Sequence, residues 1–259
     1  MFVHSFLTIF AAAAAAAGAP GVGRYPTAEA PAAAGDPPIA LLYCHLHDAI
    51  RWETRALTAD VARLQAASEG EVSGRGLGGL KRRCDFLLEI NRCHSSVEDD
   101  VVYPALDKKV GNSTSAGYSL DHEDEDAKLR QLLALIEAQK TRERPQMDLL
   151  MDKVAEVHTL MMTHLAKEES HLYPLLLKHF SRREQVSLVV EFLCSIPIVL
   201  MGEVIAWLVR RADSQAVLGI LREVRESAAS RQTLRPLLGF LDPQLEGGAA
   251  GAAGAAGAA

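Results

Sequence analysis

One pattern of thirteen residues occurs twice in this chain and constrains the fold more than any other feature. In each copy a histidine is followed at +4 by Glu, at +5 by a second acid, and at +9, +10 and +12 by Tyr, Pro and Leu. The copies span residues 94–106 and 164–176. On an α-helix, residues i and i+4 lie on the same face, one turn apart. Each copy therefore presents one imidazole and one carboxylate together, and two such faces opposed to each other form a metal site.

Apolar residues at helical spacing predict four long helices, at residues 38–67, 80–108, 118–140 and 146–178. A glycine-rich stretch at 69–79, a loop at 111–117 and Pro145 separate them. Short connections between long helices imply an antiparallel up-down bundle, so we predict an all-α, four-helix fold. Shorter helices are expected at 182–196, 197–211 and 214–228. Pro104 and Pro174 fall inside predicted helices, where we expect each to kink or end its helix.

Composition divides the chain into four parts. Residues 1–37 and 242–259 are rich in Ala and Gly and predict disordered tails, whereas 38–212 forms the main domain and 213–241 a helical extension. The apolar run at 6–17 resembles a targeting peptide, but it lacks a positively charged start and is too short to span a bilayer. The apolar stretch at 196–208 contains Pro, Gly and Glu, which favours packing on the bundle over a membrane span.

Charge and cysteine content narrow the class of protein. The net charge is −6, and no basic block offers a surface for nucleic acid. The 4 cysteines show no C-x-x-C spacing, which argues against a zinc finger or a disulfide framework. We therefore expect a cytoplasmic or nuclear location, with organelle targeting by the N-terminal segment as the alternative.

Each of the four long helices carries residues suited to bind a metal. The proposed ligands are His47, His94, Glu98, His122, Asp126, His164 and Glu168. Imidazole and carboxylate without thiolate suit iron or manganese better than a structural zinc, and the number of ligands suits two ions. Glu98 and Glu168, one from each copy of the pattern, are the expected bridges between the ions. These side chains share their faces with apolar residues, where a polar group is costly unless it is paired or metal-bound.

Two assignments near these ligands have alternatives. Glu125, at i+3 from His122, is the rival to Asp126 as the seventh ligand; otherwise Glu123, Asp124 and Glu125 are expected on a solvated acidic face. His171 lies on the ligand stripe two turns from His164, so it is either close to the site or at an exposed rim.

The ordered set His47, His94-x3-Glu98, His122-x3-Asp126 and His164-x3-Glu168 resembles the hemerythrin-type (HHE cation-binding) domain. The segments 47–51, 118–122 and 179–185 are more narrowly similar to the hemerythrin domains of BRUTUS-type ubiquitin ligases. This resemblance implies a non-haem centre of two irons with an oxo or hydroxo bridge in residues 38–212, and sensing of iron and O2 with a protein partner in a ubiquitin-ligase system.

The resemblance leaves the functional class open. Four scattered cysteines cannot build the zinc-binding modules of such ligases, so we expect a sensor or regulatory module in iron homeostasis rather than a ligase. The alternatives are a di-iron oxidase that uses O2, a protein that stores iron or oxygen and, more remotely, a metal-free helical interaction protein.

Overall fold

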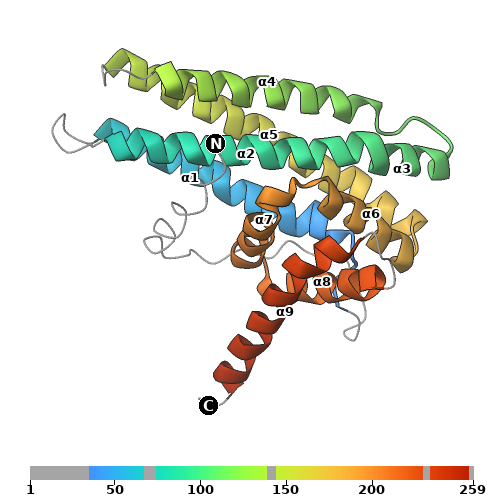
Figure 1. Cartoon of the computed structure of the whole chain (residues 1–259). Helices are drawn as coiled ribbons and strands as arrows, with labels where there is room; N and C mark the ends of the chain where they lie inside the picture. The colour runs from blue at the N-terminus through green and yellow to red at the C-terminus, as the bar shows by residue number, and fades with distance from the viewer. Residues whose placement is uncertain (1–34, 67–73, 139–143, 230–233, 257–259) are drawn as a thin grey trace. The chain divides into compact units, whose positions relative to one another are not determined.

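The computed structural model describes residues 35–66, 74–138, 144–229 and 234–256, and every regular element in these ranges is a helix (Figure 1). The expected disorder of the N-terminal tail concerns residues that lie, up to Ala34, outside the described ranges. Two of the elements are π-helical, and the others are α-helices. In chain order they are η2 (Leu41–Leu46), α1 (His47–Ala66), α2 (Gly74–Val97), η3 (Glu98–Val102), α3 (Tyr103–Val110), α4 (Ala116–Ala138), α5 (Arg144–His179), α6 (Arg182–Ser195), α7 (Ile198–Arg211), α8 (Ser214–Ala229) and α9 (Arg235–Ala256).

The four long helices α1, α2, α4 and α5 form the predicted antiparallel bundle. Helix α1 packs against α5 and α2, and α4 packs against the same two helices (Figure 1). Their facing sides are apolar and buried, with Leu57, Leu87, Leu129, Leu150 and Leu165 at most 1% exposed. Burial of this continuous apolar face stabilises the bundle, because most helix stability in proteins comes from packing rather than from intrinsic propensity.

The glycine-rich stretch differs from expectation. Helix α2 begins at Gly74, so the prediction that 69–79 separates two helices is wrong for residues 74–79. Each glycine costs a helix about 1 kcal/mol relative to alanine. Leu77 and Leu80 on the same turns pack against the core, and this burial outweighs the low propensity.

The two prolines of the repeated pattern have different effects. Before Pro104 the helix widens into η3, where the amide of Tyr103 donates to the carbonyl of Glu98, and α3 then begins with Pro104 in its first turn. Helix α5 instead runs through Pro174 to His179. Ser170 and Pro174 are both exposed, so water can satisfy the carbonyl that Pro174 leaves unbonded.

The C-terminal helices pack on one another and reach the bundle through α6 and α7. A capping box formed by Ser181 and Glu184 begins α6. On α7 the indole of Trp207 donates to Glu53 of α1 at 2.9 Å and packs edge-on against Phe86 of α2. Helix α9 continues to Ala256, into the Gly- and Ala-rich end for which composition predicts disorder. Among the described helices, none combines the length and apolar character that crossing a bilayer requires.

Candidate metal centre

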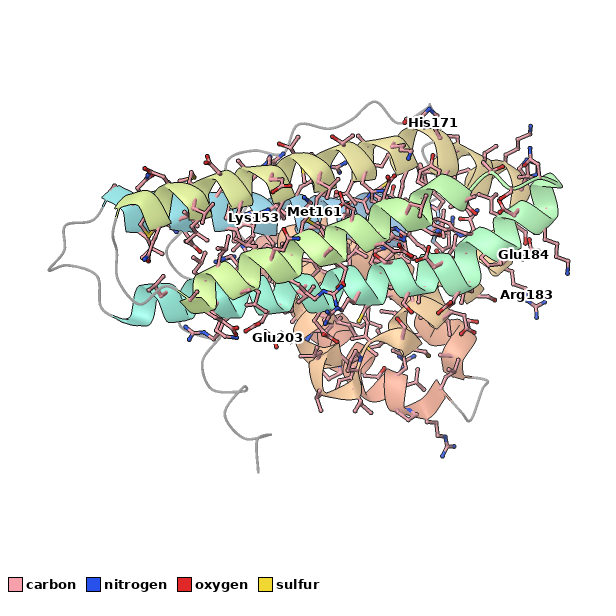
Figure 2. All side chains as sticks on the ribbon, turned by 90° about the horizontal axis from the view of Figure 1, so that it is seen from above. Lys153, Met161, His171, Arg183, Glu184 and Glu203 are labelled. Carbon is pink, nitrogen blue, oxygen red and sulfur yellow. The ribbon has the colours of Figure 1, made fainter. Side chains whose placement is uncertain are left out.

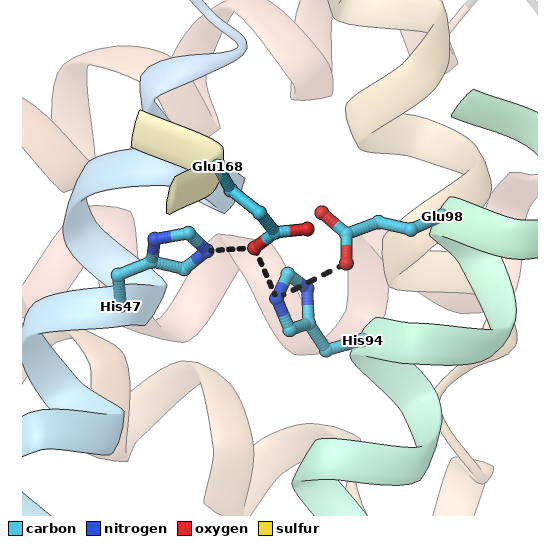
Figure 3. Close-up of side chains that lie close together, drawn as sticks. All are labelled: His47, His94, Glu98 and Glu168. Carbon is cyan, nitrogen blue, oxygen red and sulfur yellow. Dashed lines mark ion pairs between the residues drawn. The ribbon is translucent and has the colours of Figure 1, made fainter. Parts of the chain in front are cut away.

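Six of the seven predicted ligands meet inside the four-helix bundle. They come from all four helices and include both members of each repeated His-x3-Glu pair: His47, His94, Glu98, His122, His164 and Glu168. None of them is more than 4% exposed. Figure 3 shows His47, His94, Glu98 and Glu168 pointing toward one another, with His94 and Glu98 on one continuous ribbon and the other two on separate helices.

The six residues divide into two groups that share Glu168. One group is His47, His94, Glu98 and Glu168, and the other is His122, His164 and Glu168. In the first group Glu168 Oε2 lies 3.5 Å from His47 Nε2 and 4.0 Å from His94 Nε2. In the second group its other oxygen, Oε1, lies 3.5 Å from His164 Nε2 and 3.9 Å from His122 Nε2. Each oxygen of this carboxylate thus faces a different pair of histidines, which is the arrangement of a carboxylate that bridges two ions.

Glu98 also lies between the two groups. Its Oε2 is 3.2 Å from His94 Nε2, four residues earlier in the chain, and 3.4 Å from His122 Nε2 on α4. The contact within the repeat follows from helical spacing, whereas the contact with α4 exists only because the helices pack. The geometry of Glu98 therefore fits a second bridge.

Both π-helical segments adjoin ligands. Segment η2 ends immediately before His47, and η3 begins with Glu98. A π-helical turn inserts extra backbone into a helix and changes the direction of the following side chains, which is why such turns are frequent at functional sites. These turns set the angles at which α1 and the first repeat present their side chains to the bundle interior.

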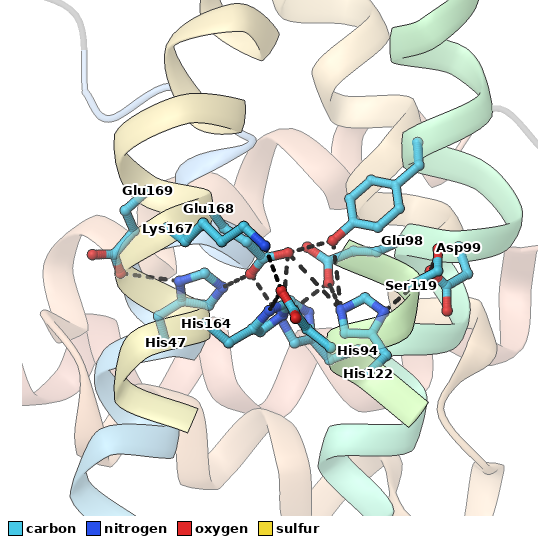
Figure 4. A network of polar contacts seen from close by, with 12 residues as sticks. His47, His94, Glu98, Asp99, Ser119, His122, His164, Lys167, Glu168 and Glu169 are labelled. Carbon is cyan, nitrogen blue, oxygen red and sulfur yellow. Dashed lines mark hydrogen bonds and ion pairs between the residues drawn. The ribbon is translucent and has the colours of Figure 1, made fainter. Parts of the chain in front are cut away.

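The second acid of each repeat holds a histidine on a neighbouring helix (Figure 4). Asp99, at +5 of the first copy, has its Oδ1 3.1 Å from His122 Nδ1 on α4. Glu169, at +5 of the second copy, has its Oε1 3.0 Å from His47 Nδ1 on α1. A carboxylate on Nδ1 fixes the ring so that the Nε2 lone pair faces the centre, as in many metal sites.

These orienting acids are themselves supported. Arg51 donates to Glu169 at 2.7 Å, and Ser119 donates to Asp99 at 2.6 Å. On the remaining side, Asp121 lies 3.5 Å from His164 Nδ1 and accepts from Lys167 at 2.6 Å. Of the four histidines in the two groups, three thus have a carboxylate next to Nδ1.

Burial controls the protonation of the site. It lowers the pKa of His47 and His94 well below the usual value and raises the pKa of Glu98 and Glu168 well above it. Several buried ligand atoms have no hydrogen-bond partner among the described residues: His47 Nε2, His94 Nε2, His164 Nε2, Glu168 Oε2 and both oxygens of Glu98. Such atoms cost free energy unless they are paired, and divalent cations would pair with all of them. The donor set therefore fits a centre of two metal ions.

The seventh predicted ligand, Asp126, does not join these groups. Its carboxylate faces away from the centre, 2.7 Å from Arg92 and 2.6 Å from Arg130. The rival, Glu125, is 2% exposed, although it was otherwise expected on a solvated face with Glu123 and Asp124, which are exposed. Burial raises the pKa of Glu125 to about 7, against the opposing effect of His122. Helix α4 thus turns Glu125, and not Asp126, toward the bundle interior.

Two histidines near the ligands in the sequence lie outside both groups. His171 is exposed on the outer side of α5 (Figure 2), with its Nδ1 3.0 Å from the carbonyl of Lys167. His45 is buried but pairs with Asp36 at 3.0 Å, on the other side of the helix from His47.

The acids Asp99, Glu169 and Asp121 were not predicted to act on the site. The repeated acid at +5 was a signal for the first two, because it recurs at the same distance from both repeat histidines. No comparable pattern marks Asp121.

Comparisons with known proteins agree with this site. The family model described as the hemerythrin HHE cation binding domain matches residues 45–185. Among curated proteins, two BRUTUS-like zinc finger proteins of Arabidopsis thaliana are 27% and 32% identical over 78% and 67% of this chain. The zinc finger protein BRUTUS of the same plant is 31% identical over 65% of the chain.

The chain spans only 13% to 16% of the length of these three relatives. No solved structure matches the chain significantly. Three observations lead to the same assignment: the four helices form a bundle, two buried groups of ligands share a glutamate, and the family match covers both groups. The chain belongs to the hemerythrin HHE cation-binding family.

Proposed function

We propose that this chain is a non-haem di-iron protein and that its iron occupancy, read by a protein partner, makes it a sensor or regulatory module. The observation that carries the proposal is the pair of buried groups sharing Glu168, built from nitrogen and oxygen donors alone. Such donors suit iron or manganese, and a di-iron centre supplies O2 binding and one-electron chemistry when bound.

The chain's own residues would hold the ions and orient their ligands. His47, His94, Glu98 and Glu168 would bind one iron. His122 and His164 would bind the other together with Glu168 and, as a second bridge, Glu98. Glu125 is the better candidate for a further ligand because its carboxylate is buried whereas that of Asp126 is paired with two arginines.

The energetics of metal binding support the sensor role. Without metal, carboxylates are buried among apolar side chains, and at least one is driven to take up a proton. A metal that binds only the folded chain stabilises it by about 4 kcal/mol at a thousandfold excess over its dissociation constant. Helix α1 contributes only His47 to the centre, so we expect it to loosen first when iron is absent. Iron occupancy then becomes a difference in folding that a partner can detect.

The biological setting is proposed from the relatives. The similarity to BRUTUS-type proteins favours a role in iron homeostasis, with a partner in a ubiquitin-ligase system, in the cytoplasm or nucleus. All 4 cysteines are free, as a reducing compartment would have them.

The test is metal analysis followed by limited proteolysis. Protein purified without added metal and then loaded with Fe²⁺ should hold about two irons per chain, from the usual composition of carboxylate-bridged bundle sites. Iron should raise the melting temperature and slow cleavage within α1. His47→Ala should remove most of this protection, whereas His45→Ala, which changes a buried histidine outside the groups, should not.

Two outcomes would contradict parts of the proposal. A single tightly bound zinc, with no uptake of iron by metal-free protein, would overturn the di-iron centre. Full iron loading with equal proteolysis rates of metal-free and loaded protein would overturn the sensor and leave an O2-dependent oxidase as the better reading.

A further inference from the structure

The segment that carries His47 is held by the C-terminal helices on both sides of this ligand in the sequence. Helix α7 contacts α1 beyond His47, and α6 contacts the residues that lead into η2. Four side chains make these contacts, and we call them the clasp: Arg182, Gln185, Trp207 and Arg211. None of them belongs to either group of metal ligands.

The contacts beyond His47 join α7 to two consecutive residues of α1. The indole Nε1 of Trp207 donates to Glu53 Oε1 at 2.9 Å, and both side chains are buried. The guanidinium carbon of Arg211 lies 3.3 Å from the centre of the Trp52 ring, as in a cation–π contact. Trp52 and Glu53 follow His47 by less than two helical turns and lie on other sides of α1. This part of α1 therefore meets the metal centre on one side and α7 on another.

Glu53 is held in this contact by a second helix. Its other oxygen, Oε2, accepts from Arg83 on α2, and Arg83 also donates to Asp60 of α1 at 2.9 Å. A buried carboxylate with both oxygens paired resists displacement, because losing a partner leaves a buried charge unsatisfied. Helix α7 thus holds α1 at a residue that is itself fixed to the bundle.

The contacts before His47 fix the start of η2. The backbone amide of Ile39 donates to Gln185 Oε1 at 3.5 Å, and Arg182 donates to the carbonyl of Asp36 at 3.1 Å. Ile39 and Gln185 are both buried, so this contact is shielded from water. Two residues in the first turn of α6 therefore set where the chain enters the π-helical segment that ends at His47.

The second group of ligands is linked differently to the rest of the chain. His122 and His164 lie on α4 and α5, and these helices pack mainly against other helices of the bundle. A change in the packing of the C-terminal helices therefore acts on α1 and His47 before it acts on His122 or His164.

We propose that the clasp positions His47 in the metal centre, so that metal binding and the packing of the C-terminal helices stabilise each other. The inference rests on the proposed metal-binding function, because it needs an ion at His47. Its physical basis is linkage: if the clasp raises the affinity of the His47 group for an ion, the ion stabilises the clasp by the same factor. The clasp residues do not touch the ions and act through α1, so they are positioning residues.

This coupling carries the state of a buried centre to the outside of the bundle. Without metal, α1 loses its link to the other ligands through His47, and the packing of α7 on α1 weakens with it. A protein partner that binds the C-terminal helices in their packed arrangement then distinguishes the loaded chain from the metal-free chain without reaching the ions.

The test compares metal affinity in variants of the whole chain. Trp207→Phe keeps an aromatic ring and removes the N–H group that donates to Glu53. Val199→Ala, at an exposed position of the same helix, is the matched control. Affinity for Fe²⁺ is measured without O2 by competition with a chelator. We expect Trp207→Phe to lower the affinity about tenfold, as is typical when a residue that orients a metal ligand is lost. Val199→Ala should bind like the wild type.

Combined variants separate positioning from general destabilisation. In a His47→Ala chain, Trp207→Phe should cause no further loss of affinity, because the ligand through which it acts is missing. In a His164→Ala chain, the loss of about tenfold should remain. The same factor in both backgrounds, or wild-type affinity in Trp207→Phe alone, would overturn the proposal.

Hydrogen exchange tests the reverse direction and does not depend on the folding of Trp207→Phe. Loading the wild-type chain with Fe²⁺ should slow exchange of the α7 amides about tenfold, since the coupling is reciprocal. In His47→Ala at saturating Fe²⁺, these amides should exchange as in the metal-free chain. Equal exchange in metal-free and loaded wild type would overturn the coupling.

Iron content, measured for every variant, separates the two proposals. A wild-type chain that binds two irons but shows no effect of iron on α7 overturns the role of the clasp and leaves the di-iron centre intact. A wild-type chain that takes up no iron overturns both.

Discussion

The two copies of the repeated pattern start from nearly the same residues and end in different local structures. The first copy spans the end of α2, η3 and the start of α3, whereas the second lies within the single helix α5. Both copies contribute a buried histidine and a buried glutamate, and both use the acid at +5 to hold a histidine on another helix. Their tyrosines differ, since Tyr103 reaches the centre and Tyr173 is kept outside it by Tyr43.

This difference distinguishes the ligand positions of the repeat, which have the same role in both copies, from the tyrosine position, whose contacts depend on the neighbouring helix. A ligand must reach the centre from its own helix, so the histidine and the glutamate keep their +4 spacing in both copies. The tyrosine at +9 is far enough along the helix that the neighbouring helix decides where its side chain fits. Helix α4 leaves room for Tyr103 at the centre, whereas η2 fills the equivalent place with Tyr43.

The largest expected effect comes from the glutamates of the two copies. Glu168 presents a different oxygen to each pair of histidines, whereas Glu98 presents a single oxygen to His94 and His122, so Glu168→Ala should weaken metal binding more than Glu98→Ala. We expect a loss of about a thousandfold in affinity for Glu168→Ala, or about 4 kcal/mol, since it removes a ligand from both ions. Glu123→Ala, an exposed control, should bind metal normally. Elemental analysis after dialysis against a chelator measures how much metal each variant retains. Equal metal content in all three variants would contradict the shared role of Glu168.

The next effect compares α4 with α1. Three residues after its ligand histidine, α4 has Glu125, whereas α1 has the apolar Ile50. The folded-state pKa of Glu125, about 7, lies above the ordinary value of 4.5. Between these values the folded chain binds more protons than the unfolded chain, so stability should fall as pH rises. Relative to Glu125→Gln, the metal-free wild type should lose about 3 kcal/mol by pH 8. Urea unfolding at several pH values measures this, with Glu123→Gln as the control. A constant difference between wild type and Glu125→Gln would mean that Glu125 is ionised throughout.

The orienting acids sharpen the comparison further. Asp99→Asn and Glu169→Gln should each lower metal affinity about 10- to 100-fold. The reason is that His122 or His47, respectively, loses the charged carboxylate that orients its ring. Glu169→Gln should have the larger effect, since it also removes a charged acceptor that the buried Arg51 binds at 2.7 Å. Asp100→Asn, at the exposed neighbouring position, is the control for the first copy. Metal titration of the three variants checks the order. An Asp99→Asn variant that binds like Asp100→Asn would show that His122 needs no support.

The smallest effect is expected at Asp126. Its ion pairs with Arg92 and Arg130 lie at the surface, and such pairs contribute about 0.2–1 kcal/mol each. Asp126→Asn should therefore keep its full metal content and unfold at a slightly lower temperature. If Asp126→Asn loses metal while Glu125→Gln does not, Asp126 is a ligand, as its spacing from His122 predicts, and α4 must rotate when metal binds.

Sequence spacing accounts for much of the site because the ligands repeat on helices. The pairs His94 with Glu98 and His164 with Glu168 share one helix face each, and this follows from the helical period alone. The bundle was predictable for a related reason: the apolar stripe of each helix has to be buried, and short connections leave antiparallel packing as the simple solution.

The sequence alone determined the fold class, the helices that form the bundle and six residues that it brings together. The tertiary structure decided which group each ligand joins, the sharing of Glu168, and the direction of helix α4. The i+3 and i+4 positions after His122 both lie near its face, and only the packing of α4 against α2 and α5 buries Glu125 and leaves Asp126 to the arginines. Likewise, no spacing rule pairs Glu169 with His47 or Tyr173 with Tyr43, because these contacts join residues more than a hundred positions apart through the packing of α5 on η2 and α1. Local periodicity fixes the face of a helix on which a side chain lies, and tertiary packing fixes what that face meets.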